Sequence, residues 1–169
     1  LEAVFRYAVF CVENGIAEPP RSHAPTARGE YECCLEPSKK PEDYDTVIVG
    51  DLREEDESLR AMVKDFAAVF PYKTRFVNIA DFPFKGGCLG CLSCRFDGKC
   101  VYDDGFDAFL EDIYKADAIV YAFTLRDHSM GACFKMFDDR GFFTALRCPT
   151  RGKPTAYIIN GGYEAEENL

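Results

Sequence analysis

Residues 46–50 read Thr46-Val47-Ile48-Val49-Gly50, a run without a charged side chain. Short apolar runs that end at glycine are typical of strands buried on both faces of a parallel sheet. Helical periodicity follows, because apolar residues recur every three or four positions from Leu59 to Phe70 and Pro71 comes next. This part of the chain therefore predicts a buried strand followed by a helix that packs on the sheet.

The same alternation continues towards the end of the chain. Further strands are predicted at residues 74–79, 118–123 and 155–160, and further helices at 106–114 and 132–140. Strands that alternate with amphipathic helices are typical of a doubly wound α/β fold, in which helices cover both faces of a mostly parallel sheet. The sequence thus predicts a three-layer α/β/α sandwich over residues 45–169.

Residues 1–44 do not follow this pattern. Val4 to Val12 is an apolar, strand-like segment, whereas residues 17–41 hold five prolines together with the Cys33-Cys34 pair. We interpret the proline-rich part as a linker or an extended arm. The sheet shows only four strands before the chain ends at Leu169, so we expect the strand-like segment either to fill a fifth position or to belong to an upstream domain.

The overall composition excludes several classes of protein. A chain of 169 residues with 47% apolar content supports one domain with its own core. Its net charge of −9 argues against nucleic acid and anionic membranes as partners, because both are bound through basic patches. No stretch approaches the roughly 20 apolar residues of a membrane helix. Nine cysteines, an odd number without a disulfide pattern, favour a reducing, cytoplasmic location.

Four of the cysteines lie within thirteen residues after the second predicted strand: Cys88, Cys91, Cys94 and Cys100. The spacing C-x2-C-x2-C-x5-C is typical of a cubane iron–sulfur cluster. Because parallel sheets bind ligands beyond the carboxyl ends of their strands, we expect the thiolates at or near that edge. Zinc is an alternative, although structural zinc usually takes two separated C-x2-C pairs, and free or redox-active thiols are a third interpretation.

Several further blocks accompany this motif: Gly98–Asp104, Ser129–Ala132, Lys135–Arg140 and Gly152–Pro154. Together with the cysteines, they make the chain from about Asp45 to Gly162 resemble the flavodoxin-like NAD(P)H-dependent FMN reductases, and among them the iron–sulfur flavoproteins. The resemblance implies a flavodoxin-like fold, FMN at the ends of the first, third and fourth strands, and a [4Fe-4S] cluster on the four cysteines. It also implies NAD(P)H as electron donor and either a homo-oligomer or a redox partner protein.

The resemblance places the flavin site in loops after three strands. The candidate cofactor-binding residues are Gly50, Arg53 and Ser58 after the first strand, Thr124, Arg126, His128, Ser129 and Met130 after the third, and Gly161 and Gly162 after the fourth. Residues 54–57 add four consecutive carboxylates to the first loop, each of which would repel a nearby phosphate by about 1 kcal/mol even in water. Acidic residues are, however, also favoured in the first turn of any helix. Arg126 stands where the family has an aromatic side chain, and an arginine can stack on a ring or pair with a phosphate.

Two functions follow as hypotheses. The first is an oxidoreductase that moves electrons between a nicotinamide cofactor, FMN and a [4Fe-4S] cluster, with catalytic residues that the sequence does not identify. The second is a non-catalytic electron-relay or binding module with a decayed flavin site and a four-cysteine scaffold for iron–sulfur or zinc. The acidic loop and Arg126 favour the second hypothesis, and the resemblance favours the first.

Overall fold

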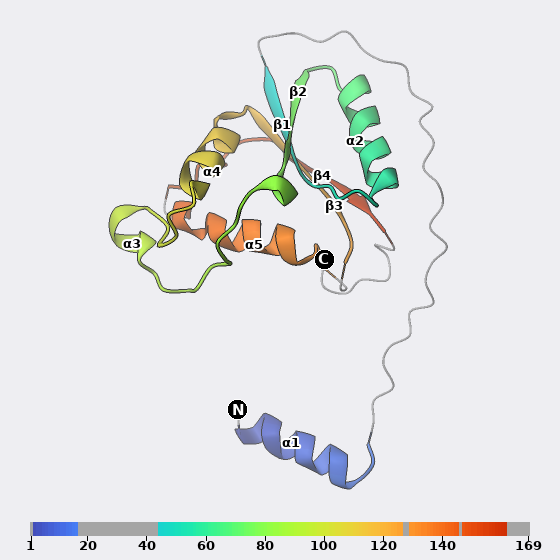
Figure 1. The fold of residues 1–169 in the computed structure, drawn as a ribbon, viewed down its shortest axis with the longest axis vertical. Helices are drawn as coiled ribbons and strands as arrows, with labels where there is room; N and C mark the ends of the chain where they lie inside the picture. Colours follow the sequence, from blue (N-terminus) through green and yellow to red (C-terminus); the bar gives the residue numbers. More distant parts are fainter. Residues whose placement is uncertain (1, 17–43, 127–128, 146, 162–169) are drawn as a thin grey trace.

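The computed structural model describes residues 2–16, 44–126, 129–145 and 147–161. Its centre is a four-stranded sheet with the order β2-β1-β3-β4 (Figure 1). The strands are β1 (Asp45–Asp51), β2 (Lys73–Asn78), β3 (Ala118–Thr124) and β4 (Thr155–Asn160). All three pairings are parallel, and Val47 of β1 lies opposite Arg75 of β2 and Ile119 of β3. Flavodoxin-like sheets use this order for their first four strands.

Helices cover both faces of the sheet, which confirms the predicted three-layer sandwich (Figure 1). Helix α2 (Glu57–Val69) packs on one face, and α4 (Phe106–Lys115) and α5 (Ala132–Arg140) pack on the other. Three single turns complete the domain: η1 (Ile79–Asp81), α3 (Cys94–Asp97) and η2 (Gly141–Thr144). Among the described residues, none of the helices is both long and apolar enough to cross a bilayer.

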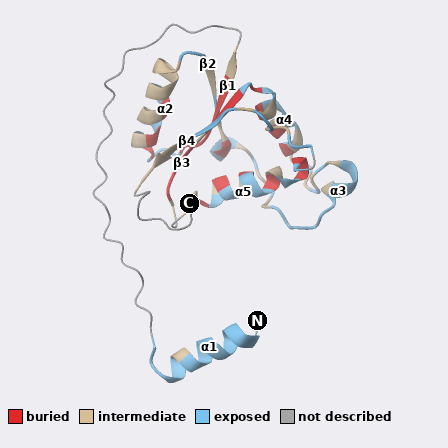
Figure 2. Ribbon diagram, turned by 180° about the vertical axis from the view of Figure 1, so that it is seen from behind, coloured by how far each residue is buried: buried red, intermediate tan, exposed pale blue. Residues whose placement is uncertain are grey.

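Two separate cores result from the alternation of side chains along the strands. Ile48 of β1 packs with Leu59 and Val63 of α2. Val47, its neighbour, points to the opposite face and packs in an aromatic core formed with α4 and α5. Phe106, only 1% exposed, lies in this second core with other aromatic rings around it. Figure 2 shows the buried residues along the strands and the inward faces of the helices.

The N-terminal segment is helical, so the strand-like interpretation of residues 4–12 is wrong. Helix α1 spans Glu2–Glu13, buries no residue and pairs with no strand of the sheet. A continuous apolar run does not by itself distinguish a strand from a helix. Here Arg6 and Glu2 form an ion pair of 2.6 Å across one helical turn, an arrangement that an extended strand does not offer. The segment therefore does not supply a fifth strand.

Several predictions concern residues outside the described part of the chain. The proline-rich linker with Cys33 and Cys34 lies there, as do His128 and Gly162.

Candidate functional site

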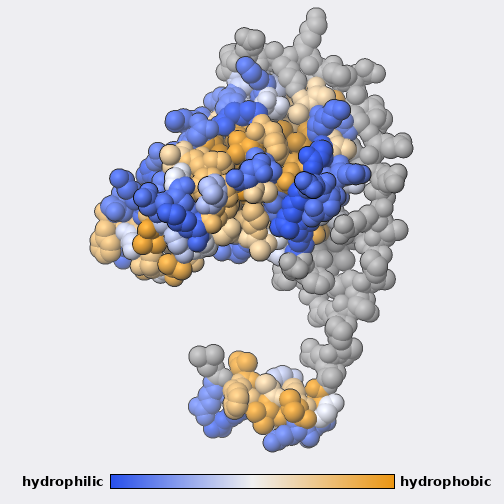
Figure 3. Space-filling model, in the orientation of Figure 1, coloured by the Kyte–Doolittle hydropathy of each residue, from blue (hydrophilic) through white to orange (hydrophobic). Residues whose placement is uncertain are grey.

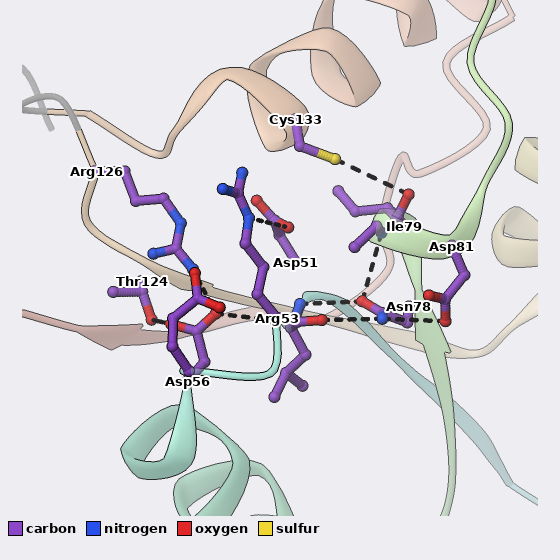
Figure 4. Close-up of polar contacts among 12 residues, drawn as sticks. Asp51, Arg53, Asp56, Asn78, Ile79, Asp81, Thr124, Arg126 and Cys133 are labelled. Carbon is purple, nitrogen blue, oxygen red and sulfur yellow. Dashed lines mark hydrogen bonds and ion pairs between the residues drawn. The ribbon is translucent and has the colours of Figure 1, made fainter.

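The first cluster of candidate residues lies at the carboxyl edge of the sheet. Arg53 follows β1, Ser58 is half-buried in the first turn of α2, and Thr124 ends β3 with Arg126 two residues further on. Because β1 and β3 are paired neighbours, the loops that follow them meet. The structure therefore brings Arg53, Thr124 and Arg126 together (Figure 4), whereas what they bind stays a prediction.

A carboxylate of the chain itself lies among these side chains. Asp56 accepts the backbone N–H of Arg53 at 2.9 Å and the hydroxyl of Thr124 at 2.8 Å, and its Oδ2 forms an ion pair with Nη2 of Arg126. We call the three donors the oxyanion cradle: the Arg53 N–H, the Thr124 hydroxyl and the Arg126 guanidinium. Asp56 is 4% exposed. Such donors bind carboxylate and phosphate oxygens alike.

Only one of the four consecutive acidic residues points inward. Glu54, Glu55 and Glu57 are exposed, as expected of acids at the start of a helix. Asp56 does not fit that interpretation, because its side chain reaches back three residues to the N–H of Arg53. Sequence reasoning counted Asp56 as one repulsive charge and missed it as the partner of Arg126. The available signal was an aspartate just before the helix, a position where its side chain commonly binds nearby backbone N–H groups.

A second buried carboxylate lies behind the cradle. Asp51 is 2% exposed, and its Oδ1 lies 3.7 Å from Nε of Arg53 and accepts no hydrogen bond from the residues that the structure describes. Burial raises the pKa of Asp51, and the charges of Arg53 and Arg126 partly offset this effect. Asn78 at the end of β2 holds the loop through two hydrogen bonds of 3.0 Å to the backbone of Leu52. The loop that forms the cradle is thus attached to the neighbouring strand.

The remaining described candidates surround the cradle. Ser129 and Arg126 exchange two backbone hydrogen bonds of 2.9 Å, and Met130 packs against the aromatic core. Gly50 and Gly161 have a structural reason to be glycine. A Cβ on Gly50 would come within 2.7 Å of a phenylalanine ring, and Gly161 has a φ of +131°, which side-chain-bearing residues rarely adopt.

A second cluster lies at the far end of α5. All four motif cysteines line one pocket there, together with Arg140 and the aromatic residues of η2: Cys88, Cys91, Cys94, Cys100, Phe142 and Phe143. The chain reaches this place because it runs along α5 after η1, where Gly87 approaches Met136. The prediction that the thiols lie at the carboxyl edge is therefore wrong. They gather around the last residue of α5, whereas Cys133 near its start is close to Ile79, at the end of β2.

Arg140 forms the buried wall of this cysteine pocket. Its side chain is 0% exposed, donates to both carboxylate oxygens of Asp104 and lies with Nη2 3.4 Å from Sγ of Cys100. The guanidinium carbon also lies 4.5 Å from the ring centre of Phe106 and 4.9 Å from that of Tyr102. The hydrogen bonds from Arg140 lower the pKa of Asp104 to about 2. Sequence reasoning missed Arg140, because an arginine in the last turn of a helix is common at any surface.

The four thiols share a pocket without forming a metal site in their present arrangement. Within the described ranges, no three or more His, Cys, Asp or Glu side chains are arranged to hold a metal ion. A single zinc ion needs its sulfur ligands about 2.3 Å from one point. A cubane iron–sulfur cluster is larger than a single metal ion, and the number of thiols and their spacing along the chain fit such a cluster. All four are free; burial raises the pKa of Cys94, and hydrogen bonding with Ser93 lowers that of Cys91.

Two curated proteins are similar to this chain. The chain is 29% identical over 132 residues to an iron-sulfur flavoprotein of Methanocaldococcus jannaschii, in a match that covers 75% of this chain and 62% of the relative. It is 27% identical over 100 residues to an iron-sulfur flavoprotein of Clostridioides difficile, covering 56% of this chain and 44% of the relative. The chain thus spans less than two thirds of the length of either protein.

A solved structure shares the fold. The crystal structure of RosB with a bound 8-demethyl-8-formylriboflavin-5'-phosphate intermediate matches with a TM-score of 0.50 at 15% sequence identity, covering 72% of this chain and 55% of RosB. A likeness at this identity shows the common α/β fold. The family described as NADPH-dependent FMN reductase matches residues 46–169, which is most of the chain and all but the first residue of the described sandwich. The chain therefore belongs to the NADPH-dependent FMN reductase family.

Proposed function

We propose that this protein is a flavin oxidoreductase that takes electrons from NAD(P)H onto FMN and exchanges them with a [4Fe-4S] cluster. The observation that carries the proposal is the oxyanion cradle at the carboxyl edge of the sheet, in a chain that belongs to the FMN reductase family. Open α/β sheets bind their ligands at this edge. Three convergent donors there suit the phosphate of a flavin nucleotide.

The residues of the cradle would bind and orient the flavin. Thr124 and Arg126 would donate to phosphate oxygens, and the Arg53 N–H would add a backbone donor from the loop between β1 and α2. Bound FMN supplies the chemistry of accepting two electrons as a hydride and passing them on singly. Asp51 is buried and has a raised pKa, and its Oδ1 accepts no hydrogen bond from the described residues, so this carboxyl would hold a proton or accept a hydrogen bond beside the cradle.

The cysteine pocket would hold the cluster. The spacing of the four thiols and the names of both curated relatives support this assignment. Arg140 would donate to the sulfur of Cys100, and hydrogen bonds to cluster sulfurs are one of the means by which proteins set a reduction potential. Cradle and pocket lie near opposite ends of α5, a helix of nine residues and therefore about 13 Å long.

We also propose that the surface around the cysteine pocket contacts a second copy or a redox partner protein. Large apolar side chains are exposed around it: Leu89, Leu92, Phe96, Val101 and Phe142. Figure 3 shows apolar surface gathered at the end of the domain where α3 lies. Phe96 is 89% exposed, which is unusual for a large aromatic side chain that does not contact a partner.

The experiment that tests the proposal is an ultraviolet–visible spectrum of protein purified without oxygen, with iron, zinc and sulfide measured on the same sample. We expect flavin bands and about four iron and four sulfide per chain, and bleaching of the flavin when NADPH is added. Cys91→Ser should lose iron and sulfide, whereas Cys148→Ser, an exposed cysteine outside the pocket, should keep both. Size-exclusion chromatography of the same sample reports the oligomeric state.

A second function is favoured by one observation, the carboxylate of Asp56 in the oxyanion cradle. It supports an electron-relay module whose flavin site has decayed. Iron and sulfide without flavin, even after incubation with FMN, would establish this alternative in place of the oxidoreductase. Zinc in the pocket, or neither metal nor flavin, would contradict both electron-transfer functions.

A further inference from the structure

We infer that Asp56 is an internal occupant of the oxyanion cradle and sets the preference of the site among flavins. A ligand phosphate binds there only by displacing this carboxylate, so the 5'-phosphate adds little to the affinity. The inference rests on the proposed function, because the same donors are proposed to hold the flavin. It names a specificity residue that the family membership does not assign.

One carboxylate engages all three members of the cradle. The Arg53 N–H, the Thr124 hydroxyl and the Arg126 guanidinium all point at the one carboxylate (Figure 4). Glu55 adds a second acid 3.9 Å from the same guanidinium nitrogen. A phosphate placed beside Asp56 would meet a like charge in a site where Asp56 is 4% exposed, and burial weakens the screening of that repulsion.

Asp56 is also free to leave the cradle without unfolding its helix. It precedes α2, but its side chain makes no capping hydrogen bond to that helix. The helix begins with the backbone carbonyl of Asp56, which accepts the N–H of Arg60 at 2.9 Å and does not depend on the carboxylate. The side chain is therefore an exchangeable anion, with about the same partners that a phosphate would use.

The consequence is a measurable order of affinities. Riboflavin lacks the phosphate and leaves Asp56 in place, whereas FMN has to displace it. The wild-type protein should therefore bind FMN and riboflavin with dissociation constants within about tenfold of each other. Neutralising the carboxylate opens the cradle to phosphate but changes nothing for riboflavin.

The experiment measures the dissociation constants of both flavins for the flavin-free protein by quenching of flavin fluorescence. It compares wild type, Asp56→Asn and the control Glu54→Gln, which removes an exposed carboxylate of the same acidic run. We expect Asp56→Asn to bind FMN at least tenfold more tightly with riboflavin unchanged, and Glu54→Gln to match the wild type. A wild type that prefers FMN a hundredfold or more, or an Asp56→Asn variant with an unchanged FMN-to-riboflavin ratio, would overturn the inference.

Inorganic phosphate separates this inference from the proposed function. If no variant binds either flavin, the proposed function fails, and the inference is then judged by thermal unfolding with and without phosphate. A phosphate-dependent rise in Tm that only Asp56→Asn shows supports it, and no rise overturns it. Asp56→Ser serves as a second neutral variant. If neither variant folds, the carboxylate is a structural requirement and not an exchangeable occupant, which also overturns the inference.

Discussion

Replacing Asp104 by asparagine tests whether its ion pair with Arg140 joins the start of α4 to the end of α5. Asp104 lies two residues before α4, and Arg140 is the last residue of α5. Both side chains are buried, at 2% and 0% exposed. Asparagine keeps an oxygen that can accept a hydrogen bond from Arg140 but removes the charge. The variant therefore leaves a buried guanidinium without its counter-charge.

The pKa of Asp104 gives the magnitude. A fall from the ordinary value of 3.8 to about 2 corresponds to about 2.4 kcal/mol at neutral pH, at about 1.36 kcal/mol for each unit. Removing one partner of a buried pair costs about 3–5 kcal/mol in other proteins. Because asparagine retains an acceptor oxygen, we expect a loss of about 3 kcal/mol in the free energy of unfolding at pH 7.

The pH dependence follows from the direction of the shift. The pKa of Asp104 is lower in the folded than in the unfolded protein. The contribution of the ion pair to the free energy of unfolding is therefore fully present above the unfolded pKa and is lost as the pH falls through about 2. Between pH 7 and pH 3 the contribution of the pair should drop by about 1 kcal/mol. The stability gap between wild type and Asp104→Asn should narrow by that amount.

Urea titrations of wild type, Asp104→Asn and Asp103→Asn at pH 7 and pH 3 measure these differences. Asp103 is the matched control, because it is the neighbouring carboxylate and is exposed. Its substitution should change stability by less than about 0.5 kcal/mol. The reasoning is refuted if Asp103→Asn loses as much stability as Asp104→Asn, or if the gap between wild type and Asp104→Asn stays the same at pH 3.

Two further predictions concern the aromatic core and the cradle side of α5. Burial raises the pKa of Cys133 to about 11, so only about 0.1% of this thiol is thiolate at pH 8. In metal-free protein, iodoacetamide should therefore label Cys133 at least tenfold more slowly than the exposed Cys148, and peptide mass spectrometry measures both rates. Equal labelling rates would contradict the burial of this thiol. Phe106→Ala should lower the free energy of unfolding by about 3–5 kcal/mol, because Phe106 is 1% exposed among packed rings. Phe142, a residue that is 54% exposed, provides the control: Phe142→Ala should lower the free energy of unfolding by less than about 1 kcal/mol. If urea titrations show similar losses for the two variants, Phe106 does not lie in the core.

Strands β1, β3 and β4 were predictable because each contains a continuous run of apolar residues with a clear end. The predicted strand 155–160 matches β4 in both bounds, and the predicted helix 132–140 matches α5. The N-terminal helix was missed for the opposite reason. Its apolar run has no strict period, so strand and helix fit it equally well. The ion pair between Arg6 and Glu2 fits the spacing of a helix and not that of a strand.

The sequence by itself determined the order of the main strands and helices from β1 onward, the three-layer sandwich and the set of four thiols, because these depend on residues close together in the chain. Only the tertiary structure decided that Asp56 fills the oxyanion cradle, since its partner Arg126 is 70 residues away. It likewise decided that Arg140 meets Cys100 across 40 residues, and that the thiols gather at the end of α5 and not at the carboxyl edge. Contacts of this kind depend on which strands become neighbours in the sheet, and the spacing of residues along the chain does not by itself predict which strands these are.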